Sequence, residues 1–394
     1  MTGLRFLTAG ESHGPELVTI VEGLPAGVPI SVEALDRDLV RRQGGYGRGA
    51  RSTKIERDSA QVVSGLAAGR TTGAPLALRI LNRDFANQPA APRPLSTPRP
   101  GHADLAGRRK YGLRDFRIVR ERASARETAA RVAAGAVARA LLAPFDVWIG
   151  SVVTAVGDVR AIEAAIGGRS VRLDELDAAT LRRRCEAAED DPLRCPDPAA
   201  SALMSAAVDE ARAKGETLGG IFWVVATGVP AGLGSYVHWD RKLDGRLAQA
   251  LCSIHAVKGA EIGPAFDLAG VPGSAAQDTI EWRDGRITRP SNHAGGLEAG
   301  VTNGEPVLVR AAMRPLSSIR SPIASVNFET GEPADPPYVR TDVCAVPAAA
   351  VVGEAMVAWV LAVALLERFG ADRLDAMLAA YAAVREADLP AAGG

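Results

Sequence analysis

The sequence predicts an α+β protein, because short β-favouring runs occur in pairs and helical segments lie between the pairs, without the regular strand–helix alternation of a parallel sheet. Of the 394 residues, 47% are hydrophobic and 23% are charged, which is typical of a globular chain with a large core. This composition excludes a disordered, collagen-like or multi-span membrane chain. No internal repeat or linker divides the sequence, and length alone allows two or three domains or one large unit.

The first third of the chain contains two predicted strand pairs and one helix. Two β-favouring runs, 4–8 and 17–21, flank the loop AGESHGPE, and two more, 61–65 and 75–81, flank the turn AAGRTTGA. Between the pairs, Ser31 precedes a helical pattern over 32–43 that a Gly-Gly step ends. The Pro-, Arg- and Asn-rich segment 82–112 predicts a long loop, and loops of this length are usually functional or disordered.

The remaining elements are mostly helical. Ser124 and Glu127 have the spacing of a capping box, which predicts a helix from 124 to 142. Residues 158–200 are rich in Ala, Arg and acidic residues and predict helices without evident chemistry. The run 221–227 predicts a strand, and 241–254 and 344–369 predict helices, the last of them long and apolar. The tail, 386–394, is expected to be disordered.

The charge balance and the cysteine and histidine content indicate which ligands and which cellular location to expect. Basic and acidic residues both number 46, so the zero net charge favours neither nucleic acid nor an anionic membrane. The four cysteines form no CxxC pair and the five histidines lack zinc-site spacing, so no metal is expected. Unpaired cysteines and an N-terminus without a signal-like segment indicate reduced thiols in the cytoplasm. The longest uninterrupted apolar run, 355–366, is too short to span a bilayer and indicates a core helix.

The segment GESHG at 10–14 places an acid, a hydroxyl and an imidazole in one glycine-flanked loop beside a strand end. Glycines allow close backbone approach to a ligand, and His13 is able to protonate a leaving oxygen near neutral pH. The alternative is a turn whose polar side chains cap their own backbone. A nucleophilic Ser12 is not supported, because no Asp-His pair with a nucleophile elbow is evident.

Arginines cluster in loops that are rich in glycine. Arg42, Arg48 and Arg51 fall within ten residues, and Arg99 and His102 repeat the combination of arginine and histidine in RPGHAD. Guanidinium groups bind carboxylate or phosphate through paired hydrogen bonds, so these loops suit a multiply anionic small molecule. In so arginine-rich a chain, a solvated basic surface is the competing interpretation.

Other polar residues lie beside helix ends. Arg126 follows a predicted helix start, where anions are favoured, and Asp342 precedes the long apolar helix, either as an early cap or as a base beside a dry pocket. The aromatic neighbours of His238, Tyr236 and Trp239, indicate that this histidine has an ordinary packing role. A nucleophilic Cys252–His255 pair is disfavoured, because the surrounding sequence has the pattern of an apolar helix face. The Gly-rich segment GGLEAGVTNG matches neither a Rossmann nor a P-loop motif.

Eight motifs in order resemble the chorismate synthase family across essentially the whole chain. They are GESHG at 10–14, QGGYGRGAR at 43–51, RPGHAD at 99–104, ERASARETAARVAAG at 121–135, KLDGRLAQALCSIHAVKGAEIG at 242–263, NHAGGLEAGVTNGEP at 292–306, RPLSS at 314–318 and RTDVCAVPA at 340–348. The resemblance implies a single domain over 1–394, a β-α-β sandwich with helices packed between two antiparallel sheets, assembled as a homotetramer.

The resemblance also implies a reaction. The family carries out the 1,4-anti elimination of phosphate and a C6 hydrogen from 5-enolpyruvylshikimate 3-phosphate (EPSP), giving chorismate in the last step of the shikimate pathway. It uses reduced FMN without net redox change, so the flavin lends electron density and receives it back. NADPH enters only indirectly, as a source of reducing equivalents, and the bacterial character of RPGHAD and RAS favours a separate flavin reductase. The alternatives are a net flavin oxidoreductase and a catalytically inactive FMN- or phosphoester-binding relative.

Residue roles follow from the matched motifs. By resemblance, His13 protonates the leaving phosphate, His102 protonates reduced flavin at N1, and Asp342 assists removal of the C6 hydrogen by flavin N5. The substrate is expected to be bound by Arg42, Arg48, Arg51, Arg99, Arg126 and Arg340. The FMN is expected to be bound by Arg122, Ala123, Ser124, His255, Ala256, Ala299, Arg314, Pro315, Leu316, Ser317, Ser318 and Arg340.

The chain departs from the family at three positions. Ala299 stands where the family usually has glycine, so either the backbone contact with FMN shifts or φ at Ala299 is below zero. Thr341 stands where Ser or His is commoner, and His255 where Pro or Gln is commoner. These departures concern cofactor affinity and leave the proposed catalytic groups intact.

Overall fold

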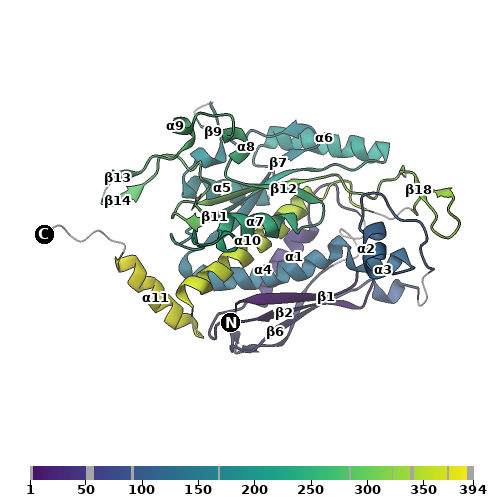
Figure 1. Ribbon diagram of the computed structural model, residues 1–394, viewed down its shortest axis with the longest axis horizontal. Coiled ribbons are helices and arrows are strands. Elements are labelled where there is room, and N and C mark those ends of the chain that lie inside the picture. Colours follow the sequence, from purple (N-terminus) through teal and green to yellow (C-terminus); the bar gives the residue numbers. More distant parts are fainter. Residues whose placement is uncertain are drawn as a thin grey trace.

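Two antiparallel sheets enclose a layer of helices (Figure 1). The computed structural model describes residues 3–49, 57–89, 93–166, 169–283, 285–321, 323–337, 341–370 and 372–387. One sheet has the order β1 (Arg5–Gly10), β2 (Glu16–Glu22), β6 (Leu76–Leu81) and β3 (Ala60–Ser64). The other has the order β12 (Val257–Ile262), β17 (Val307–Met313), β11 (Gly220–Thr227), β7 (Trp148–Val156) and β8 (Val159–Arg160). Every neighbouring pair in both sheets is antiparallel.

Four helices form the layer between the sheets: α1 (Val32–Gln43), α4 (Thr128–Leu142), α7 (Leu243–Cys252) and α10 (Val346–Phe369) (Figure 1). Helix α4 packs along α10, and a methyl group at Gly135 would overlap Ala355, so glycine is required for this close approach. One buried apolar cluster includes residues of both sheets and of all four helices. Burial of this surface is the main source of stability for the sandwich.

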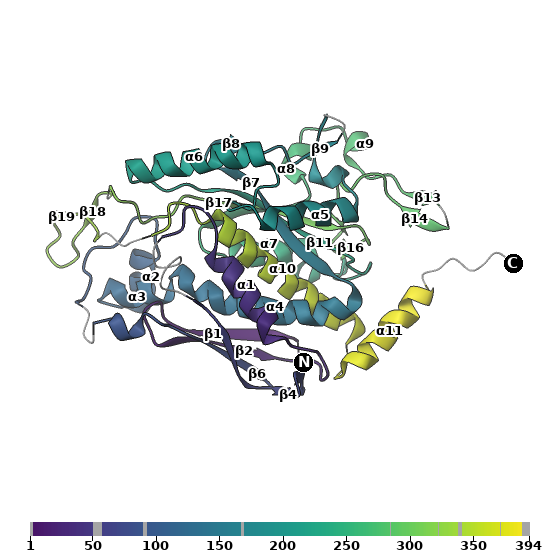
Figure 2. The ribbon, with the colours of Figure 1, turned by 180° about the vertical axis from the view of Figure 1, so that it is seen from behind.

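The five-stranded sheet is covered on its second face as well. Along β11, Phe222 and Val224 face the central helices, whereas Trp223 and Val225 belong to a second apolar cluster with Leu181 of α5 (Ala178–Glu189). Figure 2 shows α6 (Pro198–Lys214) on this outer side. Burial on both faces explains why β11 reads as a continuous apolar run rather than an alternating one. Residues 158–200, which showed no chemistry in the sequence, thus contribute to this outer cover.

Helix α10 is long and apolar enough to cross a membrane, with a mean hydropathy of 2.2, but 89% of its most apolar window is buried inside the molecule. The core-helix prediction is therefore supported by burial and not by length. Counting uninterrupted apolar residues underestimated the helix, because Glu354 lies inside it and not at its end.

Shorter helices and strands lie at the periphery of the sandwich. Helices α2 (Asp104–Tyr111) and α3 (Phe116–Arg122) lie at one end, next to the hairpin of β18 (Ser325–Val326) and β19 (Pro333–Ala334) (Figure 1). Helix α11 (Leu374–Ala387) packs on α10 through Tyr381 and Phe369. The other small elements are β4 (Leu66–Ala67), β5 (Arg70–Thr71), β9 (Ala164–Ile166), β10 (Arg169–Val171), α8 (Ala265–Leu268), α9 (Gly273–Ala276), β13 (Glu281–Arg283), β14 (Arg286–Thr288), β15 (Leu297–Glu298) and β16 (Val301–Thr302).

The α+β class and the sandwich are confirmed, but three local predictions are wrong in whole or in part. Segment 82–112 is not one structureless loop, because it contains helix α2. The capping box at Ser124 does not form: the Ser124 hydroxyl accepts a hydrogen bond from the Arg126 amide, a short 3-10 turn follows, and α4 begins only at Thr128. The Glu127 carboxylate instead binds Thr8 and Arg131. The tail predicted to be disordered, 386–394, begins inside helix α11, which ends at Ala387, so the prediction is wrong for its first two residues; the rest, from 388 onwards, lies outside the described residues.

Candidate active site

The loop between β1 and β2 is held by helix α3. The Nδ1 atom of His13 lies 2.9 Å from both carboxylate oxygens of Glu121, and the His13 amide donates to the same carboxylate at 2.8 Å. The Ser12 amide donates to the Glu121 carbonyl at 3.0 Å. The polar groups of this loop therefore bind a distant helix, and the His13 ring is held through its Nδ1 atom.

Glu121 is ionised in this arrangement. Burial alone would raise the pKa of its carboxyl group, but the hydrogen bonds and charge interaction with His13 outweigh burial, and the pKa is lowered. A neighbouring carboxylate fixes the orientation of an imidazole. Glu121 is thus a functional candidate that the sequence did not single out, although it opens the motif ERASARE.

Two of the arginines predicted to bind substrate meet over one buried carboxylate. Arg126 Nη1 lies 2.5 Å from Asp58 Oδ2, and Arg42 Nη1 lies 3.7 Å from the same oxygen. Arg42 also donates to the Thr128 hydroxyl and to the Ala125 carbonyl, each at 2.9 Å. These contacts fix both guanidinium groups at the start of α4. The cluster is therefore a buried, hydrogen-bonded site and not a solvated basic surface.

Asp342 is held by the glycine-rich loop that follows α1. Arg48 Nη1 lies 2.5 Å from Asp342 Oδ2, and the Gly49 amide donates to Asp342 Oδ1 at 2.7 Å. Asp342 does not cap α10, because the cap position is Ala345, which has no side-chain hydrogen bond. The proposed partners Arg51 and Arg340 lie outside the described residues.

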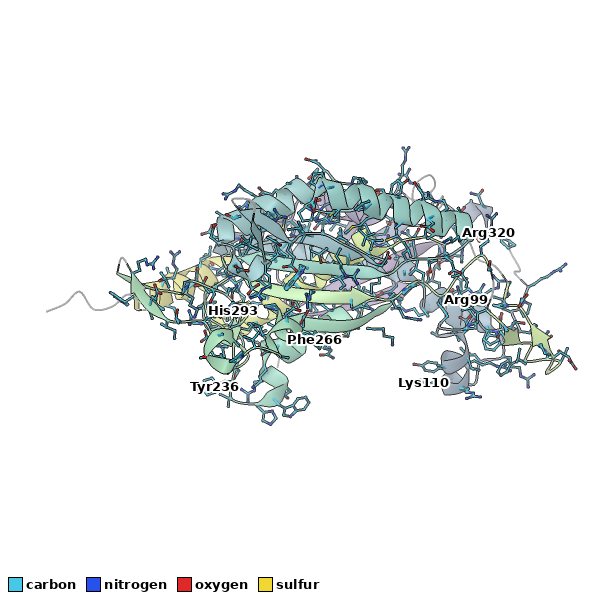
Figure 3. The ribbon with its side chains drawn as sticks, turned by 90° about the horizontal axis from the view of Figure 1, so that it is seen from above. Arg99, Lys110, Tyr236, Phe266, His293 and Arg320 are labelled. Carbon is cyan, nitrogen blue, oxygen red and sulfur yellow. The ribbon has the colours of Figure 1, made fainter. Side chains whose placement is uncertain are left out.

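A second histidine–carboxylate pair lies at the N-terminus of α2. His102 Nδ1 lies 2.5 Å from Asp104 Oδ1, and the amide and Nε of Arg99 donate to Asp104 Oδ2 at 3.0 and 3.2 Å. Asp104 is fully buried, which would raise its pKa, but the hydrogen bonds from His102 and Arg99 lower the pKa well below its usual range. Figure 3 shows Arg99 at the same end of the molecule as Lys110 of α2.

A pocket of about 550 Å³ opens beside this pair. It is lined by Pro98, Arg99, Pro100, Gly101, His102, Leu105, Ala106, Arg109 and Ser325. Arg99 Nη1 also donates to the Ser318 hydroxyl at 2.9 Å, so the pocket adjoins one of the segments predicted to bind flavin.

The segments predicted to bind FMN are connected to one another and to the His102 loop. The Arg314 amide donates to the Ala256 carbonyl at 2.9 Å, and the Arg314 side chain donates to the Gly101 carbonyl. The Ser124 hydroxyl donates to the Ser12 hydroxyl at 3.1 Å, beside His13. Arg122, by contrast, binds the carbonyls of Thr8 and Gly10 at the end of β1, so its guanidinium group already has protein partners.

Two polar atoms in these segments are buried without a partner in the described part of the chain: His255 Nδ1 and Arg314 Nε. Burial, with smaller contributions from Arg131, His102 and Arg42, lowers the pKa of His255 to about 4, although Glu127 opposes them. His255 is therefore neutral at pH 7.

Ala299 is the one described member of the predicted set that lies apart. The carbonyl of the adjacent Gly300 accepts a hydrogen bond from the Leu243 amide at the start of α7, whereas His255 follows the end of that ten-residue helix, about 15 Å away. The expectation of φ below zero is wrong, because Ala299 has φ +53° and adopts the left-handed conformation of a glycine.

His238 packs beside Trp239 as predicted, with ring centroids 6.2 Å apart, but it does so on the surface. It pairs there with Asp240 at 2.7 Å, and Tyr236 and Trp239 are 72% and 78% exposed. Cys252 is exposed rather than buried on an apolar face. All four cysteines are free thiols, and the described residues contain no group of three or more His, Cys, Asp or Glu side chains able to hold a metal ion.

The functional residues that the sequence analysis missed are the carboxylates that bind the predicted histidines and arginines. Asp104 and Glu121 lie within quoted motifs and were visible there as acids near a histidine and an arginine. Asp58 had no such signal, because it lies in an ordinary polar segment and meets Arg126 only in the fold.

Comparisons with known proteins agree along the chain. The chorismate synthase family model matches residues 4–366. A chorismate synthase from Moorella thermoacetica is 52% identical over 393 residues, covering 97% of this chain and 98% of the relative, and one from Rubrobacter xylanophilus is 52% identical over 388 residues, covering 95% of each. A crystal structure of a chorismate synthase superposes with a TM-score of 0.80 at 41% identity and covers 98% of both chains. With this fold and these paired histidines, arginines and carboxylates, the chain belongs to the chorismate synthase family of enzymes.

Proposed function

We propose that this chain catalyses the 1,4-anti elimination of phosphate and a C6 hydrogen from EPSP, giving chorismate, as a carbon–oxygen lyase of the shikimate pathway. One observation carries the proposal: in a chain that matches the family over residues 4–366, His13, His102 and Asp342 are each hydrogen-bonded to a charged side chain. Each group is therefore oriented before a ligand arrives, which is the arrangement that proton transfer needs.

His13 is the proposed acid for the leaving phosphate. Its Nδ1 is bound by Glu121, so Nε2 is the nitrogen that donates the proton. In its protonated form, the His13 imidazole also attracts the phosphate by its charge. His102 is the corresponding proton donor toward flavin N1, with Asp104 in the place of Glu121.

Asp342 is the proposed group beside the C6 hydrogen of the substrate. Arg48 and the Gly49 amide bind its two oxygens separately, so the orientation of the carboxylate is fixed. This position supports electrostatic assistance to loss of the hydrogen rather than free movement of a general base.

The substrate carries one phosphate and two carboxylates, and the arginine pairs suit that charge. Arg42 and Arg126 meet at Asp58, and Arg99 and Arg48 lie beside the other two proposed proton-transfer groups. Preorganised guanidinium groups stabilise charge on a departing phosphate without reorganisation during the reaction. Arg51 and Arg340 remain part of the proposed substrate set.

The residues proposed for FMN fit a polar, planar ligand. His255 Nδ1 and Arg314 Nε are buried without protein partners, and buried polar atoms of this kind need a hydrogen-bonding group. The proposed set also includes Ala123, Ser124, Ala256 and residues 315–318; Arg122 is already bound to β1, and Ala299 lies at the far end of α7. Reduced FMN, when bound, supplies electron density to the departing allylic system and takes it back.

The proposal extends to the assembly and setting of the enzyme. A single domain is supported by the buried cluster that joins both sheets, and a cytoplasmic location by four unpaired thiols. A homotetramer and a separate flavin reductase, with NADPH only as the indirect source of electrons, complete the proposal. They follow from the family and are testable by light scattering and by assaying NADPH oxidation with FMN alone.

The decisive experiment is chorismate formation from EPSP under anaerobic conditions with dithionite-reduced FMN, repeated with oxidised FMN and without FMN. We expect product and one equivalent of phosphate only with reduced flavin, and no net flavin oxidation. Steady flavin oxidation in proportion to product would replace the proposal with a net oxidoreductase, and FMN binding without product would indicate an inactive relative.

Variants test the assigned roles in the same assay. We expect His13→Ala and Asp342→Ala to lower kcat by at least about 100-fold, the usual range for general acid–base groups. His238→Ala is the matched control, because His238 also pairs with an aspartate but lies exposed on the surface. If His13→Ala and Asp342→Ala turned over within a few-fold of the wild type, the assigned mechanism would be wrong.

A further inference from the structure

Arg120 of α3 is a buried cation with incomplete pairing. Its side chain is only 11% exposed, and its nearest ion-pair contact is Asp104 Oδ2, 3.9 Å from Nη2, which is too long for a hydrogen bond. Its Nε and Nη2 atoms are shielded from solvent and have no hydrogen-bond partner in the described part of the chain. A buried guanidinium in this state destabilises the protein unless something else binds it.

Asp104 has little capacity left for Arg120. Its Oδ1 binds His102 Nδ1, and its Oδ2 accepts two hydrogen bonds from Arg99. The carboxylate of the next residue, Glu121, is bound by His13. The acids nearest to Arg120 are therefore already used.

The cluster has an excess of positive charge. One buried carboxylate, Asp104, faces the guanidinium groups of Arg99 and Arg120 and the His102 ring, which leaves a charge of +1, or +2 when His102 is protonated. Burial and the charge of Arg99 lower the pKa of Arg120 to about 10, although Asp104 and Glu121 oppose them. Arg99 and His102 also line the pocket of about 550 Å³, so space for a ligand adjoins the excess charge.

We propose that Arg120, with Arg99 and His102, forms a phosphate-binding subsite. Arg99 and His102 line the pocket, and Arg120 lies beside the same Asp104 carboxylate that these two residues bind. Two guanidinium groups and an imidazole suit a dianionic phosphate, which they bind through charge-assisted hydrogen bonds. Arg120 turns from Asp104 to the phosphate when the ligand enters, and its unpaired nitrogens become satisfied. The sources of such a phosphate rest on the proposed function: they are the phosphate of EPSP, the phosphate of FMN and the inorganic phosphate that is released.

The proposal makes two opposite predictions for one substitution. Arg120→Leu removes an unsatisfied charge and its repulsion with Arg99, so the ligand-free protein should melt at the same or a higher temperature than the wild type. The same variant should bind phosphate more weakly, by about 10-fold or more, as expected for the loss of hydrogen bonds to a charged group. A purely structural arginine would instead lower the melting temperature when it is removed.

The experiment uses the full chain of the wild type, Arg120→Leu and Arg114→Gln. Arg114→Gln is the matched control, because it removes the same charge from an exposed side chain six residues away. Calorimetric titrations with inorganic phosphate, EPSP and FMN are run separately, beside thermal unfolding without ligand. Arg120→Gln, similar in length and uncharged, replaces Arg120→Leu if the leucine variant does not fold.

A loss of phosphate affinity together with a loss for EPSP identifies the substrate phosphate as the occupant, and a joint loss for FMN identifies the cofactor phosphate. Unchanged affinity for all three ligands would overturn the proposal, as would a lower melting temperature with all affinities reduced equally. The inorganic phosphate titration and the melting temperature do not depend on chorismate formation. They therefore separate failure of this subsite from failure of the proposed function.

Discussion

Glu354 is the strongest single test of how the helical layer is held together. Its side chain is fully buried in the middle of α10, and it binds three arginines that come from different segments: Arg41 of α1, Arg139 of α4 and Arg194. The Ser151 hydroxyl of β7 donates to the same carboxylate at 2.5 Å. Glu354→Gln keeps the shape of the side chain and removes only its charge.

The expected loss is large because the three guanidinium groups stay in place without their shared counter-ion. Breaking a buried ion pair from one side costs about 3–5 kcal/mol. Arg41 and Arg194 also pair with Glu189, so two of the three positive charges keep a counter-ion in the variant. We therefore expect the free energy of unfolding to fall by about 3 kcal/mol. The control is Glu367→Gln on the same helix, whose 53% exposed carboxylate pairs with Arg246 and should contribute less than about 1 kcal/mol.

Both variants are compared with the wild type by urea unfolding at pH 7.5, with refolding checked by dilution. If Glu354→Gln shifted the midpoint no further than Glu367→Gln, the claim that this carboxylate joins the helices would be wrong. The pH dependence gives a second measure. Burial raises the pKa of Glu354, but the three arginines outweigh it and the pKa is lowered, so its contribution is present above about pH 4.5 and is lost as the pH falls further.

Three other perturbations have expected outcomes. Folded His255 has a pKa of about 4, so below its ordinary pKa of 6.5 it takes up a proton only when the protein unfolds. The free energy of unfolding of the wild type should therefore fall by about 2 kcal/mol between pH 7.5 and 5, and thermal unfolding scans of His255→Gln should not show this fall. Ala299→Gly removes the strain of a left-handed alanine and should stabilise the protein by up to about 1 kcal/mol, whereas Ala206→Gly in the exposed middle of α6 should destabilise it by about as much. If both variants changed the free energy of unfolding in the same direction, the backbone argument would be contradicted. Glu121→Gln removes the charge that orients His13 and should lower kcat for chorismate formation by about 10-fold or more with a smaller change in KM; an unchanged kcat would exclude the orienting role.

The sequence predicted best where the determining contacts are local. Helix α1 has the predicted bounds, because its cap and its terminating glycines are adjacent in the chain; the Ser31 hydroxyl accepts from the Ala34 amide at 3.1 Å. The apolar run of β11 identified a buried strand for a similar reason. By contrast, β12 and β17 were not predicted: β12 is short and interrupted by charged residues, and its pairing partner lies far along the chain.

The site followed the same rule. His13, His102 and Asp342 were visible as residue types in distinctive motifs, but their partners were not determined by local spacing in two of the three cases. Glu121 is 108 residues from His13, and Arg48 is 294 residues from Asp342. No periodic pattern encodes such pairs, because only the packing of α3 and of the loop after α1 brings them together. Asp104 was the exception, since it follows His102 by two residues.

Helix α3 determines the geometry of the site more than its seven residues suggest. Three consecutive side chains in its last turn have separate roles: Arg120 lies beside Asp104, Glu121 binds His13, and Arg122 binds the end of β1. Successive helical residues point about 100° apart, so this one turn contacts the His102 loop, the His13 loop and the four-stranded sheet at once. The His13 loop and the end of β1 are therefore held by a single short helix. A change in the register or tilt of α3 would displace His13, whereas a substitution at one of its three positions should affect only the partner that this residue contacts.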